Sequence, residues 1–175
     1  MTALILVESS FGNTRAIAEA IRDGLAAHTD TELFDIAQAP ADLPETVDLL
    51  VVGGPTHAFG MSRPETSEDA IRQGAPAADT RVGLREWIAA LLPDGPRPPV
   101  VTFDTRTRHR WIPGSAASQA AAALAQHGFS SAAPRQSFRV DDVPGPLVPG
   151  EVERARTWGE QLGSRLAVHR KLHPH

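Results

Sequence analysis

Small hydroxyl residues follow the first apolar segment of the chain, at a place where they could help to hold a phosphate group. The turn 9–14 reads Ser-Ser-Phe-Gly-Asn-Thr and comes directly after the apolar residues 4–7. Apolar side chains then recur at Ile17, Ile21 and Leu25, which is the period of a helix. Main-chain N–H groups in such a strand-to-helix turn converge at the positive end of the helix dipole, where they can bind an anion. The candidate phosphate ligands are Ser9, Ser10, Phe11, Gly12, Asn13 and Thr14.

A simpler interpretation of this turn needs no ligand. Asn13 could cap the helix that follows, and the other polar residues would then form an ordinary connection. The strand–turn–helix context favours the phosphate site, because Gly12 lets the backbone approach an anion closely. Other phosphate motifs are missing: the sequence has neither a Gly-x-Gly-x-x-Gly fingerprint after its first strand nor a Walker lysine.

The composition limits the classes of function that remain. The 175 residues are 41% apolar and 22% charged, as in a globular domain, and the net charge of -4 argues against a nucleic-acid surface. The lack of cysteine excludes disulfides, thiolate nucleophiles and cysteine-held iron–sulfur clusters, so a redox role would need a bound organic cofactor. No metal site is predicted. We find neither a secretory signal nor an apolar run of membrane-spanning length, and expect a cytoplasmic protein without a membrane partner.

Strands and helices alternate along the rest of the chain. The apolar runs predict strands at 3–8, 31–36, 48–54, 99–104 and 136–140. The helical periods predict helices at 13–27, 65–72, 84–92, 115–127 and 151–168. Apolar strands separated by helices indicate a parallel sheet covered on both faces, and five strands favour an open doubly wound sheet over a barrel. We expect one α/β domain over residues 1–168 and a basic, disordered tail over 169–175.

Three loops of unusual composition all follow predicted strands. They cover residues 9–14, 55–63 and 105–114. In a doubly wound sheet, ligands bind at the carboxyl ends of the strands, at the point where the strand order reverses. The three loops are therefore expected to lie together at one edge of the sheet.

The order and content of these loops resemble a flavodoxin over residues 3–166. The first loop is similar to the phosphate loop of that family, with Ser10 at one hydroxyl position and Thr14 at the last. The segment 53–60 (Gly-Gly-Pro-Thr-His-Ala-Phe-Gly) resembles the part that borders the flavin ring, and 57–64 resembles a group of flavodoxin-like proteins without an assigned role. The resemblance implies a five-stranded sheet of order 2-1-3-4-5 and non-covalently bound FMN.

On this resemblance the second loop would hold the isoalloxazine ring. Gly53 and Gly54 turn the chain off the sheet, so that backbone groups beyond them can hydrogen-bond the polar edge of the ring. Phe59 could stack on one face, whereas His57 either lines the ring or hydrogen-bonds within the loop. A ligand-free Gly/Pro turn is the alternative, which the length of the loop disfavours. The implied flavin ligands here are Pro55, Thr56, His57, Ala58, Phe59 and Gly60.

The third loop departs most from the family, since the chain has no tyrosine to place against the ring. Trp111 either stacks on the flavin or packs on the rim of the domain. Arg106, Arg108 and Arg110 form a basic run that is solvated or docks a nucleotide phosphate or an acidic partner. The candidate flavin ligands of this loop are Asp104, Thr105, Arg106, Trp111 and Gly114.

The resemblance implies an FMN-binding protein that acts in electron transfer, in which the flavin does the chemistry and no catalytic residue is named. One alternative is an NAD(P)H-dependent reductase of quinones or other small acceptors, with the arginines of the third loop on the nicotinamide nucleotide. Another is a flavodoxin-like binding module without a cofactor. Whether the redox partner is a protein or NAD(P)H stays open. Basic residues in the second and third loops offset the acidic ones, which predicts a less negative reduction potential than in an acidic flavodoxin.

Overall fold

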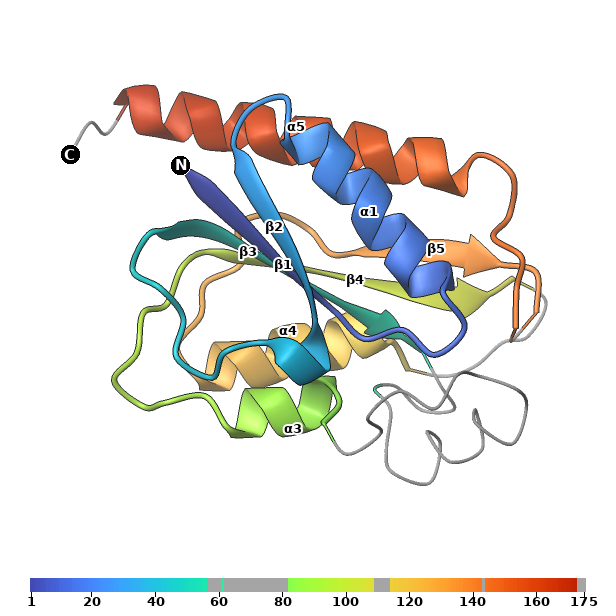
Figure 1. The fold of residues 1–175 in the computed structure, drawn as a ribbon, viewed down its shortest axis with the longest axis horizontal. Coiled ribbons are helices and arrows are strands. Elements are labelled where there is room, and N and C mark those ends of the chain that lie inside the picture. The colour runs from blue at the N-terminus through green and yellow to red at the C-terminus, as the bar shows by residue number, and fades with distance from the viewer. Residues whose placement is uncertain (57–60, 62–81, 109–113, 143, 173–175) are drawn as a thin grey trace.

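Five parallel strands form the sheet of this protein (Figure 1). The computed structural model describes residues 1–56, 61, 82–108, 114–142 and 144–172, with side chains through residue 168. The strands stand in the order β2-β1-β3-β4-β5, and every neighbouring pair is parallel. Their bounds are β1 Thr2–Val7, β2 Asp30–Asp35, β3 Val47–Pro55, β4 Val100–Thr107 and β5 Gln136–Val140. The predicted fold class and strand order are confirmed.

Helices cover both faces of this sheet (Figure 1). One face carries α1 (Asn13–Leu25) and α5 (Glu151–Leu172). The other carries α3 (Leu84–Ala89), α4 (Ala116–Gln126) and the 3-10 turn η1 (Ile36–Gln38). Both faces of the central strands are therefore buried, as apolar parallel strands require.

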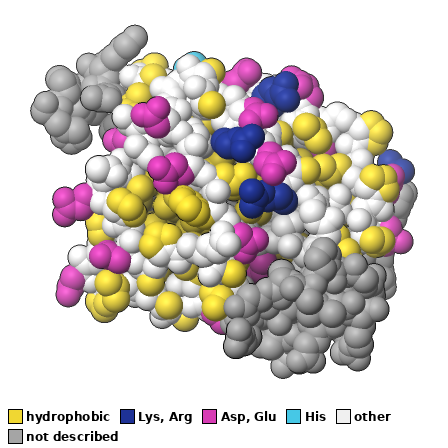
Figure 2. Space-filling model, in the orientation of Figure 1, with side chains coloured by type: hydrophobic (Ala, Val, Ile, Leu, Met, Phe, Trp, Pro, Cys, Tyr) yellow, Lys and Arg dark blue, Asp and Glu magenta, His cyan; other side chains and the backbone are white. Residues whose placement is uncertain are grey.

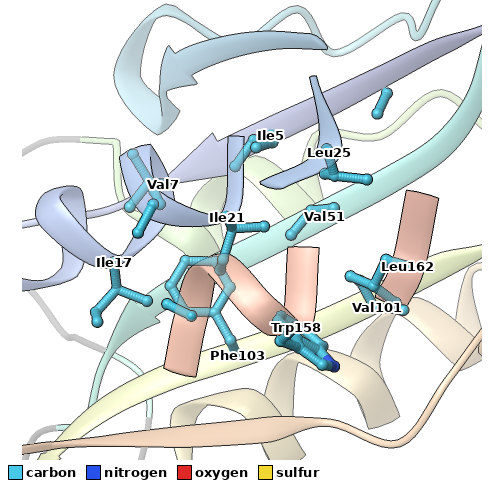
Figure 3. Packing of buried hydrophobic residues seen from close by; sticks show 14 of the residues in the cluster. Ile5, Val7, Ile17, Ile21, Leu25, Val51, Val101, Phe103, Trp158 and Leu162 are labelled. Carbon is cyan, nitrogen blue, oxygen red and sulfur yellow. The ribbon is translucent and has the colours of Figure 1, made fainter. Parts of the chain in front are cut away.

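Alternate residues of the central strands face opposite layers, because successive side chains of a strand point to opposite sides. Ile5, Val51 and Phe103 pack under α1 and α5 in one apolar cluster (Figure 3). Leu6 and Leu50 pack against α3 and α4 in a second cluster. The near-continuous apolar runs of the sequence thus fill two cores, one on each side of the sheet.

Helices α1 and α5 lie side by side and approach closely at two glycines (Figure 1). A Cβ atom added at Gly24 would lie 2.1 Å from the carbonyl oxygen of Arg156, and one at Gly159 would lie 2.3 Å from that of Ile21. Neither distance leaves room for a side chain, so both positions require glycine for steric reasons. The two helices consequently form one closely packed layer above the sheet.

Strand β4 is longer than the sequence predicts, and this changes the third loop. It ends at Thr107 instead of residue 104. Thr105 pairs with Phe138 of β5, and Thr107 pairs with Val140, so the ladder with β5 continues to this point. Thr105, Arg106 and Thr107 therefore belong to the strand and not to a loop.

Helix boundaries differ from the prediction mainly at the ends. Helix α5 runs to Leu172, four residues beyond its predicted end at residue 168. Helix α1 ends at Leu25 and α3 at Ala89, each before its predicted end. The predicted helix at 65–72 lies outside the described residues.

Candidate functional site

The turn between β1 and α1 has the backbone shape of an anion site. Gly12 has a φ of 85°, in the left-handed region, and it is the N-cap of α1 without a side-chain hydrogen bond. Asn13 is the first residue of the helix and does not cap it: its side-chain amide donates to the carbonyl oxygen of Pro144 at 3.1 Å. The hydroxyl of Ser9 accepts a hydrogen bond from the main-chain N–H of Arg15 at 3.2 Å and so closes the turn.

The turn 9–14 presents several main-chain N–H groups. Within the described part of the chain, no residue accepts a hydrogen bond from the N–H groups of residues 10–14. A Cβ atom added at Gly12 would meet nothing within 4 Å, so the approach to these groups is open there. Free N–H groups at a helix start attract an anion, since the helix dipole adds partial positive charge at the same point.

The start of α5 has a similar backbone conformation, but its first turn contains acidic side chains. Its preceding residue, Gly150, has a φ of 90°, and its first turn contains Glu151 and Glu153. The first turn of α1 contains no acidic residue. The positive end of the α5 dipole thus lies beside carboxylates of the chain, whereas the α1 start has none in its first turn.

Two buried hydroxyls tie the turn 9–14 to the third loop region. The Oγ1 atoms of Thr14 and Thr105 lie 2.8 Å apart in a hydrogen bond, and both side chains are buried. Since this contact joins the start of α1 to the end of β4, it brings two of the three predicted loops together. The two hydroxyls bind each other, whereas the main-chain N–H of Thr14, like those of residues 10–13, has no acceptor among the described residues.

A buried carboxylate ties the second loop to the third. Asp104 is fully buried, and its Oδ2 accepts hydrogen bonds from Thr56 Oγ1 at 2.8 Å and Ser115 Oγ at 2.5 Å. The main-chain N–H of Ala117 donates to the same oxygen at 3.2 Å, and the N–H of Ala116 donates to Thr56 Oγ1 at 2.9 Å. The ends of both loops are therefore fixed to the start of α4.

Strand β3 and strand β4 meet closely where the second loop begins. A Cβ atom at Gly53 would lie 2.1 Å from the ring of Phe103, so only glycine fits there. Pro55 ends β3, and the N–H of Thr56 donates to the carbonyl oxygen of Thr105 at 2.8 Å. These contacts place Thr56 beside the end of β4.

The structure brings together part of the predicted site. Thr14, Thr56, Asp104 and Thr105 lie in one connected set of contacts at the carboxyl edge of the sheet, and Ser9 contacts Arg15, the residue after Thr14. The predicted flavin ligands outside the described residues are His57, Ala58, Phe59, Gly60 and Trp111.

Of the basic residues of the predicted third loop, Arg106 and Arg108 lie in the described part of the chain, and Arg110 lies outside it. Arg106 lies on β4 beside Arg139 of β5, and Gly114 has a φ of 91° just before the N-cap of α4. Arg108 forms an ion pair with Asp141, with an Nε–Oδ1 distance of 2.6 Å. The charge of Arg108 is thereby paired within the chain, so it contributes less to the basic charge that is predicted to offset the acidic residues near the ring.

Sequence reasoning missed three contributors to this edge. Ser115 is the N-cap of α4 and binds Asp104, which a serine before an alanine-rich helix could have suggested. Glu8 accepts the main-chain N–H of Leu84 at 2.8 Å, across 76 residues of sequence. Pro144, from the connection between β5 and α5, contacts Asn13, and no local pattern points to such long-range pairs.

Two classes of site are not found in the part of the chain that the structure describes. The described residues contain no group of three or more His, Cys, Asp or Glu side chains that could hold a metal ion. Among the described helices, none is long and apolar enough to span a membrane. The prediction of no metal site concerns the whole chain and stays a prediction.

Comparison with known proteins agrees with this geometry. The flavodoxin family model matches residues 5–84. The fold matches a solved flavodoxin from the domain Archaea at 16% identity, with 95% of this chain and 99% of that one covered and a TM-score of 0.64. The chain has a flavodoxin-like fold.

Other solved flavodoxin-like structures share the whole fold at equally low identity. Oxidised Flavodoxin 2 from Bacillus cereus is 15% identical, with 94% of this chain and 99% of that one covered and a TM-score of 0.69. A flavodoxin, WrbA-like protein from Agrobacterium tumefaciens is 16% identical, with 96% and 98% covered and a TM-score of 0.57. No curated protein matches the sequence. At such identities these structures establish the flavodoxin-like fold, and the family match covers the turn 9–14 and the second loop but not β4.

Proposed function

We propose that this flavodoxin-like protein binds FMN non-covalently and carries electrons on it. The observation that supports this most is the run of main-chain N–H groups at residues 10–14 that have no acceptor among the described residues. A phosphate monoester has between one and two negative charges at neutral pH, and charge-assisted hydrogen bonds from such N–H groups are strong. The chain offers this cradle without a lysine in it.

The residues that would hold each part of FMN come from the three loop regions. The phosphate would lie on the turn 9–14, and the ring would lie between residues 55–60 and the region from Asp104 to Gly114. When bound, the flavin supplies the redox chemistry, since the side chains present offer no redox group of their own. The chain's role is to bind, orient and shield it.

The experiment compares FMN with riboflavin, which has the same ring and no phosphate. We expect titration of the apoprotein, followed by quenching of flavin fluorescence, to give FMN an affinity about a hundredfold or more above that of riboflavin. Inorganic phosphate should compete with FMN and leave riboflavin binding unchanged. Equal affinities for the two flavins would contradict the phosphate site, and a protein that quenches neither would support the cofactor-free binding module.

A second candidate function is reduction of small acceptors with NAD(P)H. In this function the arginines of the third loop would meet the nicotinamide nucleotide, and one of them, Arg106, lies on β4 in register with Arg139 of β5. Addition of NADPH to the FMN-loaded protein, without a separate reductase, distinguishes the electron carrier from the reductase. Bleaching of the flavin at a catalytic rate indicates the reductase, and an unchanged spectrum indicates a carrier that needs a protein partner.

A further inference from the structure

The carboxylate of Asp104 has two oxygens in very different surroundings. Its Oδ2 accepts three hydrogen bonds, from Thr56, Ser115 and Ala117. Its Oδ1 is equally buried, and none of the residues that the structure describes donates to it. Burial of a carboxylate oxygen without a hydrogen-bond donor costs free energy. We therefore expect a bound ligand to supply the donor that Oδ1 lacks.

The side chain of Asp104 points away from the turn 9–14. Thr105, the next residue of β4, contacts Thr14 of the turn, whereas the carboxylate of Asp104 meets the start of α4 on the other side of the sheet. Strand β4 itself stands two strands away from β1, an offset of about 10 Å at the usual strand spacing. This suits the far end of an elongated phosphorylated ligand. It does not suit the phosphate itself, which a carboxylate would repel.

The chemistry of the free oxygen narrows what can bind there. An ionised carboxylate only accepts hydrogen bonds, so its partner must carry an N–H or O–H group. The oxidised isoalloxazine ring carries a single ring N–H, on the imide of its pyrimidine half. The three donors on Oδ2 fix the plane of the carboxylate in advance, which lowers the entropic cost of using Oδ1.

We propose that Oδ1 of Asp104 accepts a hydrogen bond from the imide N–H of the flavin ring and so recognises the ring. The proposal rests on the proposed function, and it adds a specificity residue at the ring end of the site. In this arrangement Thr56, Ser115 and Ala117 are positioning groups, since they hold the carboxylate through its other oxygen.

The first test uses FMN that is methylated on the imide nitrogen, which keeps the phosphate and loses the N–H. The wild-type protein should bind FMN about tenfold to a hundredfold more tightly than this analogue, in a fluorescence titration. Equal affinities for FMN and the analogue overturn the proposal and leave the proposed function intact. Failure to bind FMN at all overturns the proposed function, and the proposal with it.

The second test asks whether Asp104 is the acceptor. In Asp104→Asn the preference for FMN over the analogue should fall to about threefold or less, because the group facing the imide is no longer an anionic acceptor. Asp94→Asn is the matched control, since Asp94 is an exposed carboxylate in the turn after α3, and it should keep the full preference. An undiminished preference in Asp104→Asn would mean that the methyl group clashes elsewhere, and it overturns the proposal. If circular dichroism shows that Asp104→Asn is unfolded, Asp104→Ser takes its place, with the same expected and overturning results.

Discussion

Gly12 and Gly150 offer a matched pair at the scale of single residues. Each immediately precedes a helix, each has a φ near 90°, and each has free space where a Cβ would stand. The main-chain oxygen of each accepts the N–H that begins its helix, from Ala16 and Arg154. The two positions differ in that only Gly12 lies in the turn with the free N–H groups, so substitutions there separate backbone strain from ligand binding.

Substitution of both glycines by alanine tests the phosphate turn. Each variant should lose about 1–2 kcal/mol of folding free energy, because an L-residue is strained in the left-handed region. Only Gly12→Ala should also weaken FMN binding, by about tenfold or more, since a shift of the turn misaligns several N–H groups at once. Isothermal titration of both variants with FMN gives the comparison. A loss of affinity of the same size in Gly150→Ala would show that the effect is one of stability and not of the turn.

At the scale of elements, the close contact of α1 with α5 fixes the helical layer that these two helices form on one face of the sheet. Gly159→Ala should destabilise the protein by about 2 kcal/mol, because the new methyl group would overlap the backbone of α1 at Ile21. The control is Glu160→Ala, an exposed position on the same helix, which should change stability by less than about 0.5 kcal/mol. Urea unfolding measures both. A Gly159→Ala variant as stable as its control would show that the two helices can separate freely.

The junction of β5 with α5 carries a carboxylate that should make stability depend on pH. Partial burial of Glu151 tends to raise its pKa, but hydrogen bonds from the Arg154 side chain and the Arg139 N–H, with both positive charges, hold the pKa below its usual value. The depressed pKa means that the stabilisation is present above the usual value of 4.5 and is lost as the pH falls through the lower, folded value.

Glu151→Gln tests this junction. At pH 7 the variant should be less stable than wild type by about 1 kcal/mol, and the difference should vanish under acid conditions, where the wild-type carboxyl is protonated. Urea unfolding from pH 7 down to pH 3 measures the difference in stability. The control is Glu153→Gln, an exposed carboxylate of the same helix turn. A difference that is the same at every pH would mean that Glu151 acts through packing and not through its charge.

For the whole molecule, ligand binding and folding should be coupled. A ligand that binds only the folded state stabilises it by about 2.7 kcal/mol at a hundred times its Kd. FMN should therefore raise the Tm of the protein in a concentration-dependent way, and riboflavin at the same concentration should raise it much less. Differential scanning calorimetry with both flavins checks this. Identical Tm shifts would indicate that the phosphate contributes nothing to binding.

The sequence by itself determined the sheet, the order of its elements along the chain and the place of the turn 9–14. Apolar runs of strand length and helical periods are local signals in the sequence. Parallel strands that are buried on both faces give a strong signal of this kind, because nearly all of their residues are apolar. The turn 9–14 could also be predicted locally, since the convergence of its N–H groups depends on one short segment of the chain. The alternative interpretation, a cap at Asn13, is wrong because the helix begins after a left-handed Gly12, which is its N-cap.

Only the tertiary structure decided which side chains meet at the carboxyl edge. The length of β4 depends on its ladder with β5, and the pairing of Thr14 with Thr105 depends on how α1 lies over the sheet. The buried state of Asp104 follows from contacts with Thr56 and Ser115, which come from other segments of the chain. Such contacts leave no periodic pattern in the sequence, because they join residues that only packing of the layers brings together.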